Sequence, residues 1–302
     1  MAQSEFDIQL KKKILETFKF TIDFLDSHNL KWWAAYGTCL GAIRHKGMIP
    51  WDDDVDIYMP REDYNRFIRI SDELRPNGYR LVTLRDKGNY IAYGKVINAN
   101  TTYVEWEVLP VVSGIWVDIF PLDSCEKDDS IFRTKLETFK SCLEKYHSSL
   151  YNYNLPLFLK ILKDRQLWLI HPGIKSLRYH STKAKREAYK QVCTAAEDLE
   201  NFNGEYYCDA SSYCIEGERD IFPKEWANDL IDVPFENFTV KVPARYDEYL
   251  SQIYGDYMTP PPVDKQVTNH LNYYTNLNEC LSIEDVKTRV KLGYKRESQE
   301  II

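Results

Sequence analysis

The most informative stretch of this 302-residue chain is Tyr36-Gly-Thr-Cys-Leu-Gly-Ala-Ile-Arg-His-Lys-Gly-Met-Ile-Pro-Trp-Asp-Asp-Asp-Val-Asp-Ile-Tyr-Met59. The apolar and aromatic residues 31–36 that lead into it predict a buried strand, which Gly37-Thr38 then interrupts. Residues 40–44 predict the first turn of a helix, and residues 54–59 alternate well enough for a second strand. Backbone N–H groups at the start of a helix that follows a strand attract phosphate. The layout therefore predicts a phosphate site beside an acidic strand.

Four carboxylates stand within five residues here, at Asp52, Asp53, Asp54 and Asp56. On a strand, Asp54 and Asp56 share one face while their neighbours Val55 and Ile57 point the other way. Two adjacent carboxylates repel each other, and a divalent cation removes that conflict. Hard carboxylate oxygens suit Mg²⁺, with Mn²⁺ as the alternative. We interpret Asp54 and Asp56 as metal ligands, and Asp52 and Asp53 as turn or cap residues.

A further acid lies in a strongly apolar run, Trp116-Val-Asp-Ile-Phe120. A charge at Asp118 needs a partner, because burying an isolated carboxylate is costly. A metal ion would supply that partner. We therefore predict Asp118 as the third ligand, contributed by a neighbouring strand.

These residues together resemble the LicD family, phosphocholine transferases of bacterial surface glycans that are related to the fukutin-type transferases and belong to the nucleotidyltransferase superfamily. The resemblance rests on residues 36–64 and on Gly114-Ile-Trp-Val-Asp-Ile-Phe-Pro-Leu-Asp123. It returns at Phe222-Pro-Lys-Glu-Trp226, at residues 233–237 and at Tyr254-Gly-Asp-Tyr-Met-Thr-Pro-Pro261. No cysteine cluster resembles the zinc site of some fukutin-type relatives, which favours the bacterial type.

The resemblance implies a donor such as CDP-choline and the hydroxyl of a glycan or lipid-linked sugar as acceptor, as in teichoic acid or lipopolysaccharide synthesis. Asp54 and Asp56 would hold Mg²⁺ against the donor pyrophosphate. Asp118 would complete this catalytic site and accept the proton of the attacking hydroxyl. Phosphocholine would pass to the sugar and CMP would leave.

The residues that we expect to bind substrate surround the acids, and they are Gly37, Thr38, Arg44, His45, Trp51 and Lys95. Three have a structural alternative: Lys95 as a surface lysine of an edge strand, His45 as a turn residue and Trp51 as packing for its own turn. A quaternary ammonium group is recognised by aromatic faces. The chain offers too many of them to assign a choline site, namely Trp51, Tyr58, Trp106, Trp116, Trp226, Tyr254 and Tyr257.

Two alternatives to phosphocholine transfer stay open. One keeps the fold and the metal but uses CDP-ribitol or CDP-glycerol as donor, since the motifs do not separate these compounds. The other is a catalytically silent protein that retains the nucleotide pocket. The intact Asp54, Asp56 and Asp118 speak against the silent protein.

Strand-like runs at 79–84, 90–97, 101–105 and 115–120 lie close together, which favours mixed pairing over a doubly wound parallel sheet. We therefore predict an α+β fold with a nucleotidyltransferase-like mixed sheet, flanking helices and a mainly helical middle region. The expected divisions are a catalytic core at 1–125, a helical region at 126–204 and an irregular C-terminal region at 205–302. These parts are expected to pack as one unit.

Composition limits the partners and the location. Lys and Arg number 39 against 46 Asp and Glu, a formal net charge of −7 that argues against a nucleic-acid binder. The seven cysteines form no C-x-x-C pair, and the N-terminus lacks the apolar segment of a signal peptide. We expect a cytoplasmic protein, with the inner face of the cytoplasmic membrane as the alternative. The run 155–170 is too often interrupted by charge to span a bilayer, so it is either a peripheral membrane contact or a buried helix with a solvated edge.

Overall fold

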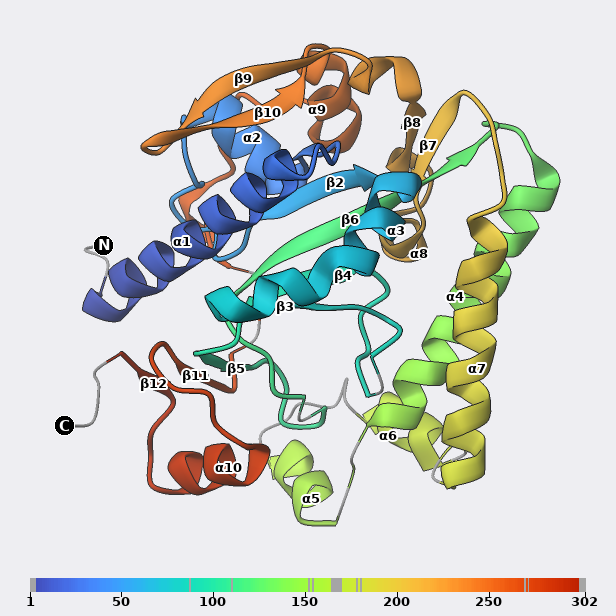
Figure 1. The fold of residues 1–302 in the computed structure, drawn as a ribbon. Helices are drawn as coiled ribbons and strands as arrows, with labels where there is room; N and C mark the ends of the chain where they lie inside the picture. The colour runs from blue at the N-terminus through green and yellow to red at the C-terminus, as the bar shows by residue number, and fades with distance from the viewer. Residues whose placement is uncertain are drawn as a thin grey trace.

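The computed structural model describes residues 4–86, 88–109, 111–151, 153, 155–163, 170–177, 179, 181–268, 270 and 272–298. Its centre is a seven-stranded sheet in which β1, β2, β6, β4 and β3 lie in that order, while β7 and β8 continue from β6 (Figure 1). The bounds are β1 Trp33–Ala34, β2 Asp56–Pro60, β3 Tyr79–Val82, β4 Gly94–Asn98, β6 Trp116–Cys125, β7 Tyr206–Asp209 and β8 Ile221–Pro223.

The pairing within this sheet is mixed. Strands β2 and β6 are parallel and place Asp56 directly beside Asp118. The other pairs are antiparallel, and β4 places Lys95 on the opposite side of Asp118. The predicted α+β fold with a mixed sheet is therefore confirmed. It brings three charged side chains from three strands into one row.

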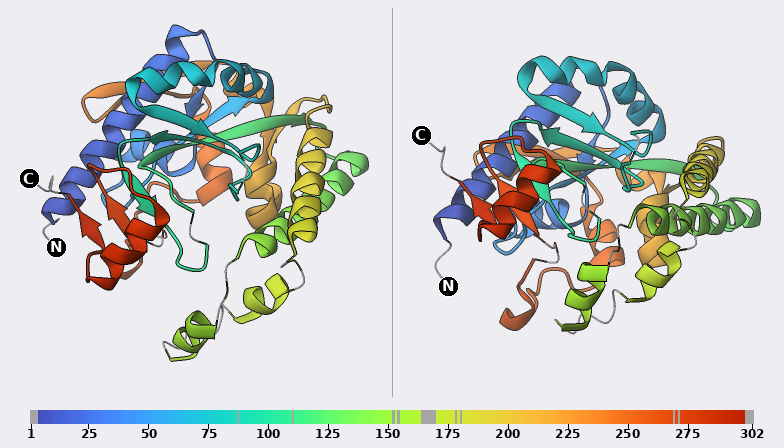
Figure 2. Two further views of the ribbon diagram at one scale, coloured as in Figure 1. Left: turned by 60° about the horizontal axis from the view of Figure 1, so that its bottom comes forward. Right: turned by 90° about the horizontal axis from the view of Figure 1, so that it is seen from below.

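Helices cover one side of the sheet with apolar side chains. Helix α1 (Glu5–Ser27) begins with a Ser4 capping box and buries a stripe at helical spacing that includes Ile14, Phe18, Ile22 and Leu25. Helix α3 (Arg61–Ile70) continues into the 3-10 helix η1 (Ser71–Asn77). Helices α1 and α3 lie on the same side of the sheet. Helices α8 (Ala210–Glu216) and α9 (Tyr246–Tyr254) lie toward the other side (Figure 2). Helix α2 (Tyr36–Arg44) connects β1 to the acidic segment.

The middle of the chain is mainly helical, as expected. Helices α4 (Ser130–Leu150) and α7 (Thr182–Leu199) pack along each other and share an apolar cluster that includes Phe132, Phe139 and Val192. Helices α5 (Leu155–Lys163) and α6 (Ile170–Leu177) connect them at the end away from β6 (Figure 1).

The C-terminal part is more regular than its sequence indicates. It contains a hairpin of β9 (Leu230–Phe235) and β10 (Phe238–Pro243), and α10 (Ile283–Lys291) with the short strands β11 (Tyr274–Asn276) and β12 (Arg296–Glu297). Strand β11 pairs with β5 (Thr102–Val104). Further short turns of 3-10 helix are η3 (Gly217–Asp220), η4 (Lys224–Ala227) and η5 (Val263–Lys265). These elements are too short to show a period, and prolines inside β8, β9 and β10 resemble loop signals.

The apolar run 155–170 is described only in part, since residues 164–169 lie outside the described residues. Helix α5 exposes Leu155, Phe158, Leu159 and Leu162, while Ile161 is buried. Among the helices that the structure describes, none combines the length and the hydropathy needed to cross a bilayer. A membrane contact, one of the two alternatives for this segment, stays a prediction.

Candidate active site

A cleft of about 630 Å³ opens beside the start of β2 and β6. Its walls come from the first residues of α2, the acidic segment, β6, the start of α8 and the segment that follows α9. These parts are far apart in the sequence, and the sheet brings them together. The predicted metal ligands and several predicted substrate-binding residues lie in this cleft.

Asp54, Asp56 and Asp118 each place a carboxylate oxygen within 4.8 Å of the other two. Asp56 opens β2 and Asp118 faces it across the parallel ladder, while Asp54 lies just before the strand. The structure thus brings the three predicted ligands together. Their metal role stays a prediction, and their spacing fits a single small cation.

The electrostatics of this group favour a cation. Burial and then the charges of Asp54 and Asp118 raise the pKa of Asp56 well above its usual range. Burial also raises the pKa of Asp118 to about 6, although Lys95 opposes the shift. Oδ1 of Asp118 is buried and accepts no hydrogen bond of good geometry from the described part of the chain, although Lys95 Nζ forms an ion pair with it at 3.1 Å. Buried carboxylates with unused oxygen lone pairs are hard ligands, so the residues present fit Mg²⁺ or Mn²⁺.

Gly37 and Thr38 open α2 at the edge of the cleft. A Cβ on Gly37 would lie 2.7 Å from Oδ2 of Asp52, so a larger residue here would displace the Asp52 side chain. Thr38 is buried and does not line the cleft; its Oγ1 accepts a hydrogen bond of 2.8 Å from the backbone N–H of Asp56. Within the described residues, the N–H groups of Gly37 and Thr38 have no acceptor, and α2 has no side-chain cap.

Lys95 is largely buried beside Asp118 on the inner strand β4, so the alternative of a surface lysine on an edge strand is wrong. Its side chain is 12% exposed, and Nζ is 3.1 Å from Oδ1 of Asp118. Nζ also lies 4.1 Å from the ring centroid of Trp116, whose Nε1–H donates to Oδ2 of Asp118 at 3.0 Å. Lys95 and Trp116 thus hold the carboxylate of Asp118 from one side.

Two of the three other predicted substrate-binding residues line the cleft. Arg44 and Trp51 line the cleft, and Arg44 Nη1 donates to the carbonyl of Tyr257 at 2.6 Å. His45 is not among the cleft-lining residues; its ring meets the edge of Trp51 at a centroid distance of 5.9 Å. Burial and the adjacent charge of Arg44 lower the pKa of His45. His45 therefore supports Trp51 in this structure.

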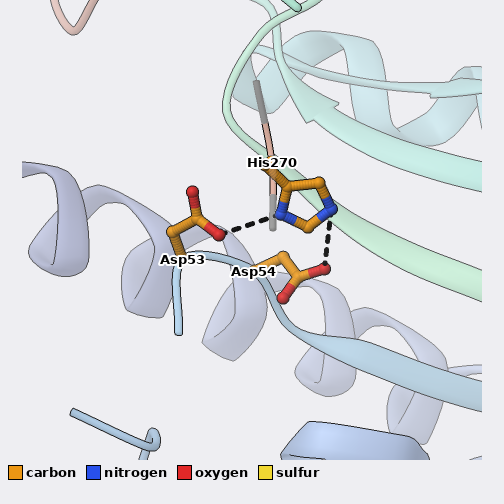
Figure 3. A group of neighbouring side chains, drawn as sticks. All are labelled: Asp53, Asp54 and His270. Atoms are coloured by element: carbon orange, nitrogen blue, oxygen red, sulfur yellow. Dashed lines mark hydrogen bonds and ion pairs between the residues drawn. The ribbon is translucent and has the colours of Figure 1, made fainter. Parts of the chain in front are cut away.

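His270 is a residue of the site that the sequence did not reveal (Figure 3). Its Nδ1 is 2.9 Å from Oδ1 of Asp53, and its Nε2 is 3.5 Å from Oδ2 of Asp54. Burial opposes protonation of His270, but the bond to Asp53 and the charges of Asp54, Asp53 and Asp118 raise its pKa to about 9. Asp53, expected as a turn residue, thus links the acidic segment to the C-terminal part. No local sequence pattern predicts this contact, because the two residues lie 217 positions apart in the sequence.

Aromatic side chains form a second wall of the cleft. Tyr36, Tyr93 and Phe120 line it, with ring centroids 4.5 Å apart for Tyr93 and Phe120 and 5.4 Å apart for Tyr36 and Phe120. Behind them the hydroxyl of Tyr36 lies 3.0 Å from Oδ2 of Asp209 and 2.8 Å from Oδ1 of Asp220. The single hydroxyl proton of Tyr36 cannot bond to both carboxylates at once. Burial therefore favours a proton on one of the two carboxyl groups, Asp209 or Asp220.

Asp52 also lines the cleft, close to the first turn of α2. Burial, followed by the charge of Asp54, raises its pKa to about 8. The interpretation of Asp52 as a mere turn residue is therefore incomplete, because its carboxyl group is part of the cleft wall.

The chain is similar to known transferases. Residues 29–151 match the LicD/FKTN/FKRP nucleotidyltransferase domain. The lipopolysaccharide cholinephosphotransferase LicD of Haemophilus influenzae is 29% identical over 245 residues, which are 78% of this chain and 84% of that protein.

Two further similarities cover shorter parts of the chain. The ribitol 5-phosphate transferase FKRP of Homo sapiens is 36% identical over 52 residues, 17% of this chain and 10% of that protein. The uncharacterised protein RT0683 of Rickettsia typhi is 42% identical over 74 residues, 24% of each chain. The resemblance to the LicD family is confirmed, and residues 29–151 of this chain form its LicD/FKTN/FKRP nucleotidyltransferase domain.

Proposed function

We propose that this protein transfers phosphocholine from CDP-choline to a sugar hydroxyl of a cell-surface glycan precursor and releases CMP. The observation that carries the proposal is the meeting of Asp54, Asp56 and Asp118 in one cleft. The similarity to the cholinephosphotransferase of Haemophilus influenzae, which covers most of both chains, supports the choice of donor group.

Asp54, Asp56 and Asp118 are the residues that would hold Mg²⁺, with Mn²⁺ as a substitute. The bound cation would neutralise charge on the donor's phosphate oxygens during transfer. Asp118 also accepts the proton of the attacking hydroxyl, since Lys95 and Trp116 fix its carboxylate in one orientation. Positioning and charge neutralisation are the main contributions that phosphoryl-type transfer requires from a protein.

The donor phosphates are proposed to lie between the acids and the start of α2. The N–H groups of Gly37 and Thr38 are aimed by a helix N-terminus, which favours anions. Arg44 adds a cation on the same wall, where its contact with the Tyr257 carbonyl fixes the guanidinium. Trp51 completes this wall and is held by His45.

Choline would meet the aromatic wall. Quaternary ammonium groups bind to aromatic faces, and Tyr36 and Phe120 present such faces in the cleft that contains the acids, whereas Lys95 already lies over the ring of Tyr93 at 5.6 Å. The nearby negative charge of the acidic segment also suits a cation. Ribitol phosphate or glycerol phosphate from a CDP donor remains the second candidate, supported by the similarity to the ribitol 5-phosphate transferase over 52 residues.

The test is a donor screen that follows CMP release. The purified protein is incubated with Mg²⁺, an amino-sugar or lipid-linked acceptor, and CDP-choline, CDP-ribitol or CDP-glycerol in turn. We expect CMP with CDP-choline and phosphocholine on the acceptor. Release of CMP from CDP-ribitol alone would overturn the choline assignment. Binding of CDP-choline by calorimetry with no turnover on any acceptor would support a silent nucleotide-binding protein.

We further propose that the protein contacts a membrane surface through α5. Its exposed Leu155, Phe158, Leu159 and Leu162 form an apolar face on a helix that also carries lysines. Sedimentation with anionic liposomes tests this contact. The double variant Leu159→Ser/Leu162→Ser should stay in the supernatant, and equal sedimentation of both proteins would exclude α5 as the contact.

A further inference from the structure

A second cavity of about 280 Å³ lies beside the cleft on the same face of the sheet. The register places Asp56, Asp118, Lys95 and Val82 next to one another on four neighbouring strands. Side chains directly opposite on adjacent strands point to the same face, and the strands are ~4.8 Å apart. Asp56 and Asp118 line the cleft, whereas Lys95 and Val82 line the second cavity. The two hollows are therefore next to each other.

The wall between them is one layer of side chains. Lys95 and Trp116 line the cavity, and both contact the carboxylate of Asp118, which lines the cleft. Lys95 Nζ lies over the Trp116 ring at 4.1 Å, so the two side chains form a single unit. A ligand in the cavity would have this unit between most of its atoms and the acids. A single substituent of the ligand would have to pass only the Lys95 and Trp116 side chains to reach Asp118.

The lining of the cavity suits an uncharged ligand with several hydroxyl groups. Among the described residues that line it, Arg80 and Lys95 are balanced by Asp86 and Glu105. The hydroxyl of Tyr90 donates to Oε2 of Glu105 at 2.6 Å, which directs a carboxylate and a phenol into one corner. Carboxylates accept hydroxyl protons, and tyrosine rings contact the C–H faces of a polyol.

The same lining argues against the choline group. A quaternary ammonium ion needs an excess of negative charge or bare aromatic faces. Here Lys95 already occupies the face of Trp116, and its ammonium would repel a second cation. The donor's cationic group therefore belongs in the cleft, and the cavity is left for the other substrate.

We infer that this second cavity binds one sugar unit of the acceptor. The inference rests on the proposed function. The sugar sits against Tyr90 and Glu105 with its reacting hydroxyl directed past Lys95 toward Asp118. In the transfer, that oxygen forms the new bond to phosphorus and its proton passes to Asp118. The bond from phosphorus to the CMP oxygen breaks, and CMP leaves with the electron pair.

Direct sugar binding is the first test, and it needs neither donor nor metal. Saturation-transfer difference NMR is recorded on the full chain with free galactose, glucose and N-acetylgalactosamine. We expect binding of at least one sugar to the wild type and about tenfold weaker binding to Tyr90→Phe and Glu105→Gln, the loss that one hydrogen bond typically causes. No binding of any sugar, or equal binding by wild type and variants, would overturn the inference.

A matched control separates the cavity from general effects on folding. Tyr274 donates its hydroxyl to Glu297, a pair of the same kind that lines neither hollow. Tyr274→Phe should therefore bind the sugar like the wild type. If its sugar signal falls as far as that of Tyr90→Phe, the cavity has no special role.

Kinetics give the second test. Tyr90→Phe and Glu105→Gln should raise the acceptor KM about tenfold while leaving the affinity for CDP-choline, measured by calorimetry, unchanged. A changed donor affinity with an unchanged acceptor KM would assign the cavity to the donor and contradict the inference. A protein that binds sugar at Tyr90 but uses no CDP donor would refute the proposed function alone.

Discussion

Thr38 Oγ1 accepts a 2.8 Å hydrogen bond from the backbone N–H of Asp56. This contact joins the first turn of α2, where phosphate is expected, to the first residue of β2, which carries a carboxylate of the site. Both residues are buried, so water does not replace the bond. The hydroxyl of Thr38 therefore fixes the two halves of the candidate site relative to each other.

Thr38→Val should cost stability and activity together. Valine keeps the shape of threonine but leaves the buried N–H of Asp56 without an acceptor, which costs ~1–3 kcal/mol. Chemical denaturation measures the loss, and Thr38→Ser should restore most of it. Thr134→Val is the control, because Thr134 is exposed on α4 and bonds only within its helix. If Thr38→Val is as stable as Thr134→Val, the bond to Asp56 is not needed.

Asp56→Asn should abolish turnover without unfolding the protein. The substitution removes one of three carboxylates that lie within 4.8 Å of one another, so it relieves repulsion in the metal-free protein. We expect turnover to fall at least about 100-fold, because a catalytic cation supplies several kcal/mol. The melting temperature without metal should be equal or higher, and its rise on adding Mn²⁺ should shrink. Wild-type activity in this variant would exclude Asp56 as a ligand.

The local pattern predicted the acids and the sheet but not their distant partners. Asp118 was recognisable because an acid in an apolar strand needs a nearby compensating charge, and that signal is contained in five residues. His270 lies 217 residues from Asp53, and its role depends on how the segment after α9 folds back. Thr38 was expected at the phosphate through its backbone N–H, but the bond from Asp56 to its hydroxyl was not expected, since helical phase decides which way a side chain points. Only the packed chain fixes that phase.

His270→Ala should loosen the contact between the C-terminal segment and the acidic segment. The substitution removes the 2.9 Å bond to Asp53 and the 3.5 Å contact with Asp54. We expect the free energy of unfolding to fall by ~1–2 kcal/mol and turnover to fall as the cleft wall loosens. His28→Ala is the matched control, because His28 contacts Glu73 at the surface. Equal, small effects of the two substitutions would show that His270 does not support the site.

Asp220→Asn should weaken the dependence of stability on pH. Burial and then the charge of Asp209 raise the pKa of Asp220 to about 7, and burial raises that of Asp209 to about 6. A carboxyl group whose folded pKa is raised stabilises the fold below the unfolded pKa and loses this contribution as pH rises toward the folded pKa.

The wild type should therefore lose stability between pH 4 and pH 7, on the order of 1–3 kcal/mol. Urea denaturation at pH 5 and pH 8 measures the difference. The asparagine variant should lose less over the same range, whereas the exposed control Asp72→Asn should follow the wild type. A wild type whose stability rises across this range, with no difference in Asp220→Asn, would contradict the assignment.

Lys95→Met tests the charge that balances Asp118. Methionine keeps much of the length of lysine but leaves a buried carboxylate without its cation 3.1 Å away. Breaking a buried pair from one side costs ~3–5 kcal/mol, so the metal-free variant should unfold at markedly lower denaturant concentration. A divalent cation held by Asp118 would replace part of the lost charge, and Mn²⁺ should therefore stabilise the variant more than the wild type. Lys19→Met removes an exposed partner of Asp23 and should change neither quantity. If Mn²⁺ stabilises Lys95→Met and the wild type equally, Asp118 is not a metal ligand.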